Sequence, residues 1–397
     1  MIENGCKDSW YRDPILFIES KGFSMKIRCR RNKFVPLFST IANFTASRDV
    51  RPMLQNVKLV ANETSLLLMA TDGEVGARGE LTETEAFVVD NPGEAILPAK
   101  LLRKIFAETT DEEIYIELQG SQITIKGAHF RYQLDTCDDA DRFPLVPSFD
   151  ETTYFKIPVN SFNRMVGRTV FATQNNNNHF ELRGVKFIFS VDRITAVATD
   201  GRRLACQENA SESFGDAQQE NFTSQEAIFP PRTLNLIVRS DSEADDVLIA
   251  AHEADAIIKI GNIVVSTTLM TGLFPNWNAI IPDKTSKKRV DFIADEVARA
   301  IRQAEIVTTE NKPGVWFKFS KGTFNITAAG EATGESSVEL PIAYDGEPAE
   351  LRLDSKFLNE FFREVPGEET VAFYFQQDYR TLFETSDGYR YVLMQLS

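Results

Sequence analysis

Cysteine and histidine are scarce in this chain of 397 residues, which contains four cysteines and three histidines. The cysteines show no close pairing in the sequence, so they indicate neither a disulfide framework nor a zinc site. The histidines are too far apart to form a local ligand set. These seven residues are Cys6, Cys29, Cys137, Cys206, His129, His179 and His252. We therefore expect no metal and no cofactor.

Long apolar runs are also missing. No stretch approaches the roughly 18 apolar residues that indicate a membrane-spanning helix. Residues 1–24 lack the basic start, the apolar core and the small-residue cleavage site of a secretory signal. Hydrophobic residues make up 43% of the chain, which is enough for several cores. We expect a soluble, folded protein of the cytoplasm that has no membrane partner.

A long internal repeat is the most informative feature that is present. The tetrapeptide Ala-Thr-Asp-Gly occupies residues 70–73 and 198–201, and a weaker copy, Ala-Ala-Gly, occupies 328–330. The copies begin 128 and 130 residues apart, whereas solenoid repeats have periods of about 20–50 residues. Other matched segments follow a similar period: 54–59 with 182–187 and 312–317, 96–102 with 228–234, and 143–144 with 274–275. We infer that one small domain is present three times.

Each copy is expected to open with a helix, to continue through strands and the Asp-Gly turn, and to add a second helix before its last strands. The expected opening helices are 32–44, 159–171 and 294–307, and the second helices are 98–108, 231–238 and 354–364. Alternating runs such as 114–118, 122–126 and 371–375 are typical of strands. Two helices on one face of an antiparallel sheet give an α+β fold in three tandem copies.

The net charge of −15 argues against nucleic-acid binding by the chain as a whole. The expected helices nevertheless carry more basic than acidic residues. Helices placed around a shared opening would give it a basic lining, which attracts phosphates without reading sequence. The alternative is that these basic residues only decorate exposed helix faces, and the charge alone does not decide between the two.

Several segments together resemble a known family. They are Ala198–Ala205 (ATDGRRLA), Phe274-Pro275 with Pro282, Ile96–Ala99 and Tyr391–Met394. In order and spacing the chain resembles the bacterial sliding clamp, the β subunit of DNA polymerase III, over about residues 25–397. The resemblance implies domains at 25–149, 150–283 and 284–397, preceded by an N-terminal extension, 1–24, that is disordered or a start-site artefact. It also implies a non-catalytic homodimer, closed head to tail into a ring whose helices face duplex DNA without reading its sequence.

The resemblance further implies a pocket between the second and third domains that takes a short peptide motif with apolar anchors. The expected partners are the DNA polymerase III catalytic subunit, an ATP-dependent clamp loader, and other polymerases and repair proteins. The matching pocket positions are Leu182, Thr199, Gly201, Arg202, Arg203, Leu204, Pro275, Ile280, Phe357, Val392, Leu393 and Met394. Four features depart from the family pattern: Arg202 for histidine, Ala279 for arginine, Lys312 for an aromatic residue, and the ending Gln395-Leu396-Ser397.

Two further sets of residues carry over from the resemblance. The expected DNA contacts are Arg48, Arg51, Arg103, Lys104, Arg164 and Arg168, with the asparagine run 175–178 as a loop near DNA or an ordinary flexible loop. The expected dimer contacts are Phe130 in the first domain and Ile306 and Val307 in the third. Opposite ends of the chain would then meet, as a head-to-tail ring requires.

Two alternatives remain. A clamp paralogue with altered partner specificity would explain the changed C-terminus and Lys312. A hydrolytic enzyme could use Asp72 and Asp200, because paired carboxylates perform acid/base chemistry. However, Asp-Gly is also a turn signature, in which Asp bonds the local backbone and Gly adopts a positive φ. The third copy lacks this Asp.

Overall fold

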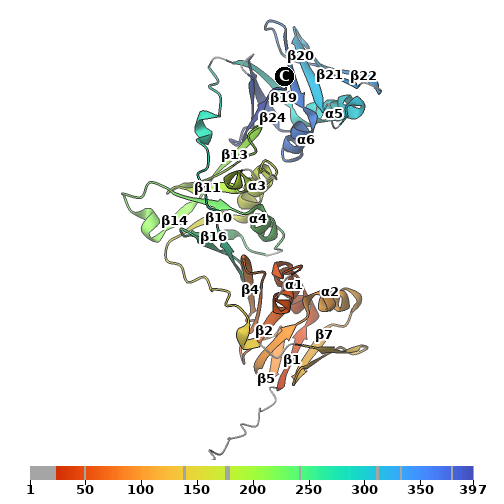
Figure 1. Ribbon diagram of the computed structural model, residues 1–397, viewed down its shortest axis with the longest axis vertical. Helices are drawn as coiled ribbons and strands as arrows, with labels where there is room; N and C mark the ends of the chain where they lie inside the picture. Colours follow the sequence, from red (N-terminus) through yellow and green to blue (C-terminus); the bar gives the residue numbers. More distant parts are fainter. Residues whose placement is uncertain are drawn as a thin grey trace, which may run out of the picture.

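The computed structural model describes residues 24–48, 51–136, 140–174, 179–240, 243–285, 287–309, 313–330, 333–376 and 379–396. Within them, one order of elements recurs three times: a strand, a helix, four or five strands, a second helix and three strands. We call these the first, second and third units. Figure 1 shows them as a curved row with the helices on its concave side.

The elements of the first unit begin with β1 (Ser24–Arg30), α1 (Arg31–Ile41), β2 (Val57–Ala61), β3 (Leu66–Thr71), β4 (Val75–Leu81) and β5 (Phe87–Asn91). They continue with β6 (Gly93–Leu97), α2 (Ala99–Glu108), β7 (Glu113–Gln119), β8 (Gln122–Lys126) and β9 (Arg131–Asp135).

The second unit begins with β10 (Tyr154–Pro158), α3 (Val159–Val170), β11 (Val185–Phe189), β12 (Arg193–Thr199), β13 (Arg203–Ala210) and β14 (Glu212–Phe214). It continues with β15 (Gln225–Phe229), α4 (Pro231–Val238), β16 (Asp246–Ala251), β17 (Asp255–Ile260) and β18 (Ile263–Thr268).

The third unit begins with β19 (Lys288–Ile293), α5 (Ala294–Ala304), β20 (Gly314–Ser320), β21 (Thr323–Gly330) and β22 (Gly334–Pro341). It continues with β23 (Ala349–Asp354), α6 (Ser355–Arg363), β24 (Thr370–Phe375), β25 (Arg380–Glu384) and β26 (Arg390–Met394).

The six helices lie where the sequence predicts them, within a few residues. The side chain of Asp354 caps α6 by accepting a hydrogen bond from the backbone N–H of Lys356 at 2.9 Å. The expectation that each copy opens with a helix was wrong, because a short strand precedes α1, α3 and α5. Such strands are brief: β10 has five residues with alternating burial. Ser24, which the sequence assigns to the extension, already belongs to β1.

The sheets run continuously from one unit into the next. Strand β4 of the first unit pairs antiparallel with β18 of the second, inside a nine-stranded sheet. Strand β13 of the second unit pairs in the same way with β26 of the third, inside an eight-stranded sheet. Each junction therefore has its own ladder of backbone hydrogen bonds, which fixes the register of neighbouring units.

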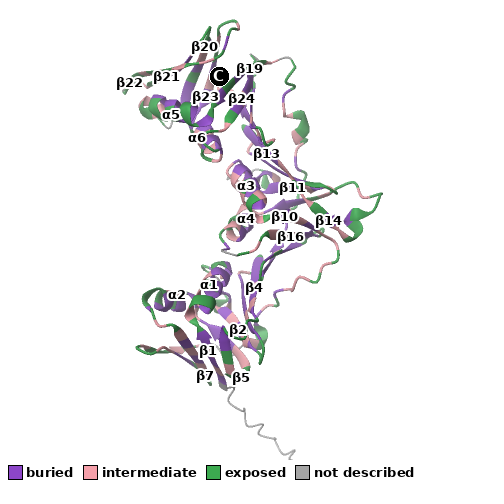
Figure 2. Ribbon diagram, turned by 180° about the vertical axis from the view of Figure 1, so that it is seen from behind, coloured by how far each residue is buried: buried purple, intermediate pink, exposed green. Residues whose placement is uncertain are grey.

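The pattern of burial follows the sheets and the helices described above. Figure 2 shows buried residues concentrated in the strands and on the helix faces that cover them. The thiols of Cys29 and Cys206 are free and buried, and burial raises the pKa of Cys206 to about 11. Among the described residues, no helix combines the length and apolar character needed to span a bilayer. The described part of the chain likewise has no cluster of three or more metal-ligating side chains.

Candidate functional site

The repeated Thr-Asp-Gly segment forms the same turn in the first two units. One carboxylate oxygen of Asp200 accepts hydrogen bonds from the backbone N–H groups of Arg202 and Arg203, at 2.9 and 3.1 Å. Asp72 does the same for the two residues at its own turn. Gly73 and Gly201 have φ values of 99° and 87°, which favour glycine. Both aspartates are therefore occupied in shaping a turn.

The second turn delivers β13 to the third unit. Leu204 lies opposite Val392 of β26, and Val392 lies opposite Leu382 of β25. Because side chains alternate across a strand, these three residues share one face of the sheet. Their neighbours Arg203 and Leu393, also opposite each other, point to the other face, which carries α3 and α6.

Apolar side chains from both units gather on the face with Leu204. We call them the junction cluster. Its buried members are Leu182, Val197, Leu204, Cys206, Ile228, Phe274, Tyr374, Leu382 and Val392, and its half-exposed members are Ile188, Met270, Trp277, Ile280, Ile281 and Ala372. Four predicted pocket residues, Leu182, Leu204, Ile280 and Val392, belong to this cluster. A fully buried floor with half-exposed aliphatic and aromatic walls is suited to holding apolar peptide side chains.

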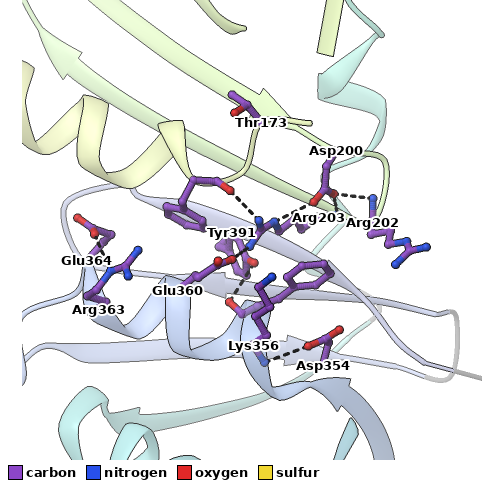
Figure 3. Close-up of polar contacts among 12 residues, drawn as sticks. Thr173, Asp200, Arg202, Arg203, Asp354, Lys356, Glu360, Arg363, Glu364 and Tyr391 are labelled. Carbon is purple, nitrogen blue, oxygen red and sulfur yellow. Dashed lines mark hydrogen bonds and ion pairs between the residues drawn. The ribbon is translucent and has the colours of Figure 1, made fainter. Parts of the chain in front are cut away.

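The opposite face holds a buried charge network around Arg203, shown in Figure 3. The guanidinium bonds Asp200 at 3.0 Å, pairs with Glu360 of α6, and donates to the carbonyl of Phe171 at 2.6 Å. It also stacks 4.2 Å from the centre of the Phe357 ring. Burial opposes the charge of Arg203, but Tyr391 and Glu360 outweigh it and raise the pKa of the guanidinium.

Three predicted pocket residues lie outside the junction cluster. Arg203, Leu393 and Phe357 are on the helix-bearing face, and Leu393 is only 1% exposed; contact of these three with a peptide stays a prediction. Their role in the structure is to hold the two units together. The family resemblance grouped all three with the pocket. For Arg203 and Leu393, neighbouring residues of one strand cannot be assigned to opposite faces before the register is known.

The remaining predicted pocket residues lie around the rim. Gly201 and Arg202 are exposed, Pro275 and Met394 are half-exposed, and Thr199 is buried with its hydroxyl donating to the carbonyl of Arg203 at 2.6 Å. The backbone N–H of Met394 donates to the carbonyl of Arg202 at 2.9 Å. Lys312 lies outside the described residues.

The six helices carry a basic excess. Their basic residues are Arg31, Lys33, Lys100, Arg103, Lys104, Arg164, Arg168, Arg232, Arg299, Arg302, Lys356 and Arg363, and their acidic residues are Glu108, Asp295, Glu296 and Glu360. Since the whole chain has a net charge of −15, the helices are basic relative to the rest of the chain. A basic lining of the concave side stays a prediction.

Arg168 is not available to DNA, which corrects that prediction. It is 2% exposed, pairs with Asp387 at 2.7 Å and bonds Gln207 at 2.7 Å. Its guanidinium lies 4.8 Å from the centre of the Tyr389 ring. The residue therefore joins the second unit to the third. The pattern of α3 alone could not reveal a partner more than two hundred residues further along the chain.

The other predicted DNA residues are accessible to different degrees. Arg48, Arg51 and Lys104 are exposed, and Arg164 is exposed while lying 3.4 Å from Asp387. Arg103 is half-exposed and donates to the carbonyl of Ser39, which joins α2 to α1; burial lowers the pKa of its guanidinium. The asparagine run 175–178 lies outside the described residues.

The predicted dimer residues lie at the two ends of the row. Phe130 is half-exposed and its ring packs 5.8 Å from that of Tyr132 in β9, an edge strand of the first unit. Ile306 is 77% exposed, and the half-exposed Val307 follows it. Both lie close to β22, an edge strand of the third unit. Each end thus offers an open sheet edge with apolar side chains beside it.

Sequence reasoning missed several residues that complete these sites. Glu360, Asp387 and Tyr389 hold the second junction, and Met270 and Trp277 line the junction cluster. Trp277 carried a usable signal, because it lies between two predicted pocket positions, Pro275 and Ile280. No signal in the sequence indicated Asp387 or Tyr389, because neither matches a motif and both act through partners that are distant in the sequence.

Comparison with known proteins agrees with this geometry. Residues 25–147 match the family described as DNA polymerase III beta subunit, N-terminal domain, and residues 156–276 match its central domain. The chain is 25% identical to the beta sliding clamp of Chlamydia pneumoniae, over 87% of this chain and 91% of the relative. It is 26% identical to that of Pseudomonas aeruginosa, over 88% and 92%.

Solved structures show the same fold. The DNA polymerase sliding clamp from Bacillus subtilis superposes with a TM-score of 0.86 at 19% identity, covering 94% of this chain and 99% of that one. The sliding clamp of Pseudomonas aeruginosa bound to griselimycin gives 0.85 at 24% identity, covering 94% and 100%. The fold is therefore an α+β DNA-clamp fold.

The chain belongs to the family of DNA polymerase III β subunits, the β sliding clamps, which are non-catalytic processivity factors. The resemblance stated from the sequence is confirmed. Asp72 and Asp200 have the turn-forming role described above, so the hydrolase alternative is excluded by the family and has no support from the site.

Proposed function

We propose that two copies of this chain close head to tail into a ring around duplex DNA, at the replication fork in the cytoplasm, and tether the DNA polymerase III catalytic subunit. The observation that carries the proposal is the curved row of units with all six helices on its concave side (Figure 1). A second copy that continued this curve would place both sets of helices around one opening. In this proposal the three units are domains at 25–149, 150–283 and 284–397, and 1–24 is an extension.

The basic helices support a sliding rather than a fixed contact. Lys104 and Arg164 are exposed on helices of the concave side, and together with Arg48 and Arg51 they would meet phosphates of any sequence. Arg103 would contribute mainly through its bond to α1. Phosphate contacts of this kind position DNA without reading bases. The acidic remainder of the chain would repel DNA from the outside of the ring.

The ring closure would pair the two open sheet edges. Strands β9 and β22 both have free edges and lie at opposite ends of the row. Phe130 of one protomer would pack near Ile306 and Val307 of its partner. Such a heterologous contact closes into a ring only if the rotation between copies closes.

The junction cluster would serve as the docking surface for partner peptides. Leu and Phe side chains of a short motif would contact Ile280, Trp277 and Met270 above the buried floor of Leu204 and Val392. The proposed partners are the polymerase III catalytic subunit, other polymerases and repair proteins, and an ATP-dependent clamp loader that opens the ring.

Retention on nicked circular DNA tests the topological part. The protein is loaded with a clamp loader and ATP, and release is followed before and after the circle is cut. We expect retention on the circle and rapid loss from the cut ends. Ile306→Arg should abolish loading by preventing dimerisation, as measured by sedimentation, while Lys321→Glu in an exposed turn is the control.

Other outcomes would be equally informative. Equal persistence on circular and linear DNA would show that direct contacts hold the duplex, which contradicts sliding. Rapid loss from both by a confirmed dimer would indicate a ring that is not loaded, as expected of a paralogue with different partners.

A further inference from the structure

The rim of the junction cluster carries two arginines, one on each side of strand β26. This inference rests on the proposed docking of partner peptides and concerns what those peptides must contain. Arg202 (the residue just before β13), Met394 of β26 and Arg380 of β25 form a row across the sheet. The carbonyl of Arg202 accepts from Met394, and Met394 lies opposite Arg380 in the ladder.

This rim row lies directly beside the floor of the cluster. The next row on the same face, two residues along each strand, is Leu204, Val392 and Leu382. Because side chains of a strand alternate with a period of two, Met394 and Arg380 point to the same side of the sheet as Val392 and Leu382. The side chain of Arg202, just before β13, points away from that of Arg203, as Figure 3 shows. A peptide that leaves the apolar floor in this direction therefore crosses a thioether flanked by two guanidiniums.

Arg380 reaches toward the wall of the cluster. One terminal nitrogen of its guanidinium, Nη1, lies 3.2 Å from the carbonyl oxygen of Ala279 and 3.5 Å from that of Ile280. The side chain is exposed, so its remaining N–H groups face solvent at the edge of Ile280. An arginine thus stands beside Ala279 even though position 279 itself has none.

Arg202 lies at the other end of the row. It is exposed, and Figure 3 shows its side chain pointing away from the buried Arg203 network. Within the described part of the chain, no carboxylate forms an ion pair with Arg202 or Arg380. The nearby acids have other partners: Glu384 pairs with Lys284 at 2.5 Å, and Asp291 with Arg289 at 2.9 Å.

We propose that this row selects partner peptides that carry an Asp or Glu side chain next to their apolar anchors. A guanidinium presents paired N–H donors that match a carboxylate. Arg202 and Arg380 are two strands apart, or roughly 10 Å between backbones, so each guanidinium would bind a separate carboxylate or the two would flank one. Met394 supplies the apolar contact between them. The two guanidiniums make this rim locally positive, although the whole chain has a net charge of −15. A peptide with acidic residues beside its anchors is therefore favoured over one with basic residues there.

Three synthetic peptides test the proposal by fluorescence polarisation with the full-length protein. All have the same Leu and Phe anchors and an acetylated start. The first has Glu flanks and an amidated end, the second has Gln flanks and an amidated end, and the third has Gln flanks and a free C-terminal carboxylate. Exposed ion pairs are individually weak, so we expect the Glu peptide to bind roughly fivefold more tightly than its Gln twin, with the difference shrinking as salt is added.

The double variant R202Q/R380Q should abolish this preference, so that the Glu and Gln peptides bind with equal affinity. Lys321→Gln removes a positive charge from the exposed β20–β21 turn and should leave the preference intact. Since the three positions are exposed, unchanged thermal unfolding is the check that the fold persists.

Three results would overturn the inference. The Glu peptide could bind no better than the Gln peptide, the preference could survive in R202Q/R380Q, or only the free-carboxylate peptide could gain affinity, which would make the chain end the source of the charge. In each case peptide docking itself would stand. Failure of all three peptides to bind would instead contradict the docking surface, and this inference with it.

Discussion

The two junctions between units are built on the same plan and filled with different side chains. At the first junction β4 meets β18, and at the second β13 meets β26, in both cases antiparallel. At the first junction a salt bridge between Asp72 and Arg232 joins the two units, and the Arg232 side chain is exposed. At the second junction, the buried side chains of Arg203 and Arg168 join the two units, and each lies against an aromatic ring.

The difference begins in the repeated turn. The position that Arg203 occupies after the second Thr-Asp-Gly is taken by Val75 after the first. The strand that follows in the first unit has small residues, and a Cβ on Gly79 would lie 2.5 Å from the Leu37 side chain of α1. In the first unit β4 therefore packs closely against its own helix α1, and no buried cation stands at the position that Arg203 holds in the second.

The apolar clusters beside the two junctions differ as well. In the first unit, the corresponding cluster comprises Met69, Ile96, Phe143 and Val146 with half-exposed Met53, Val60, Leu67 and Ala140, all from that unit. The junction cluster draws on both the second and the third units. Its shape therefore depends on how those two units are held together. The two junctions of this repeated scaffold therefore differ in which units supply their apolar clusters.

The largest expected difference between the junctions concerns stability. Arg203→Met would leave Glu360 and Asp200 without their cation, and breaking a buried pair from one side costs about 3–5 kcal/mol. Arg232→Met at the first junction should cost less, on the order of 1 kcal/mol, because the Arg232 side chain is 52% exposed to solvent. Hydrogen exchange of β26 and β18 amides reports each junction separately, which matters because a chain of several units need not unfold in one step. Equal effects of the two substitutions would contradict the contrast.

The next largest expected effect is on peptide affinity, in which the apolar clusters beside the two junctions should differ. Ile280→Ala removes a half-exposed wall of the junction cluster, and loss of an apolar anchor contact of this kind costs on the order of 1–2 kcal/mol, or about tenfold in peptide affinity. Leu67→Ala makes a comparable truncation in the cluster of the first unit and should leave affinity unchanged. Titration of a peptide with Leu and Phe anchors measures both. A loss with Leu67→Ala would place docking at the wrong junction.

Some of the residues used in these tests could be predicted from the sequence, and others could not. The six helices could be predicted because their apolar spacing and proline or aspartate starts are local signals. Leu182, Leu204, Ile280 and Val392 could be grouped because the family resemblance carries them together. Arg168 and Leu393 are buried, which the sequence did not reveal, for a physical reason. Their surroundings come from a strand pairing and an ion pair that join positions about two hundred residues apart, and neither leaves a local pattern.

The smallest expected effect is a pH dependence confined to the second junction. Burial by itself raises the pKa of Asp387, but hydrogen bonds from Thr385 and Arg168 and the charge of Arg164 lower it below the usual value. A carboxylate with a lowered pKa stabilises the folded state above its unfolded pKa of about 3.9, and this contribution is lost as the pH falls through the folded pKa. We therefore expect amide protection of β26 to weaken as the pH falls below about 4, and that of β18 to change less.

Asp387→Asn should remove this part of the pH dependence, because the amide does not titrate. At neutral pH the variant should lower β26 protection slightly, since Arg168 loses its charged partner. Asp291→Asn is the matched control, because Asp291 is a half-exposed carboxylate of the same unit that pairs only within β19. A β26 profile that retains its acid sensitivity in Asp387→Asn would show that Asp387 is not the group responsible.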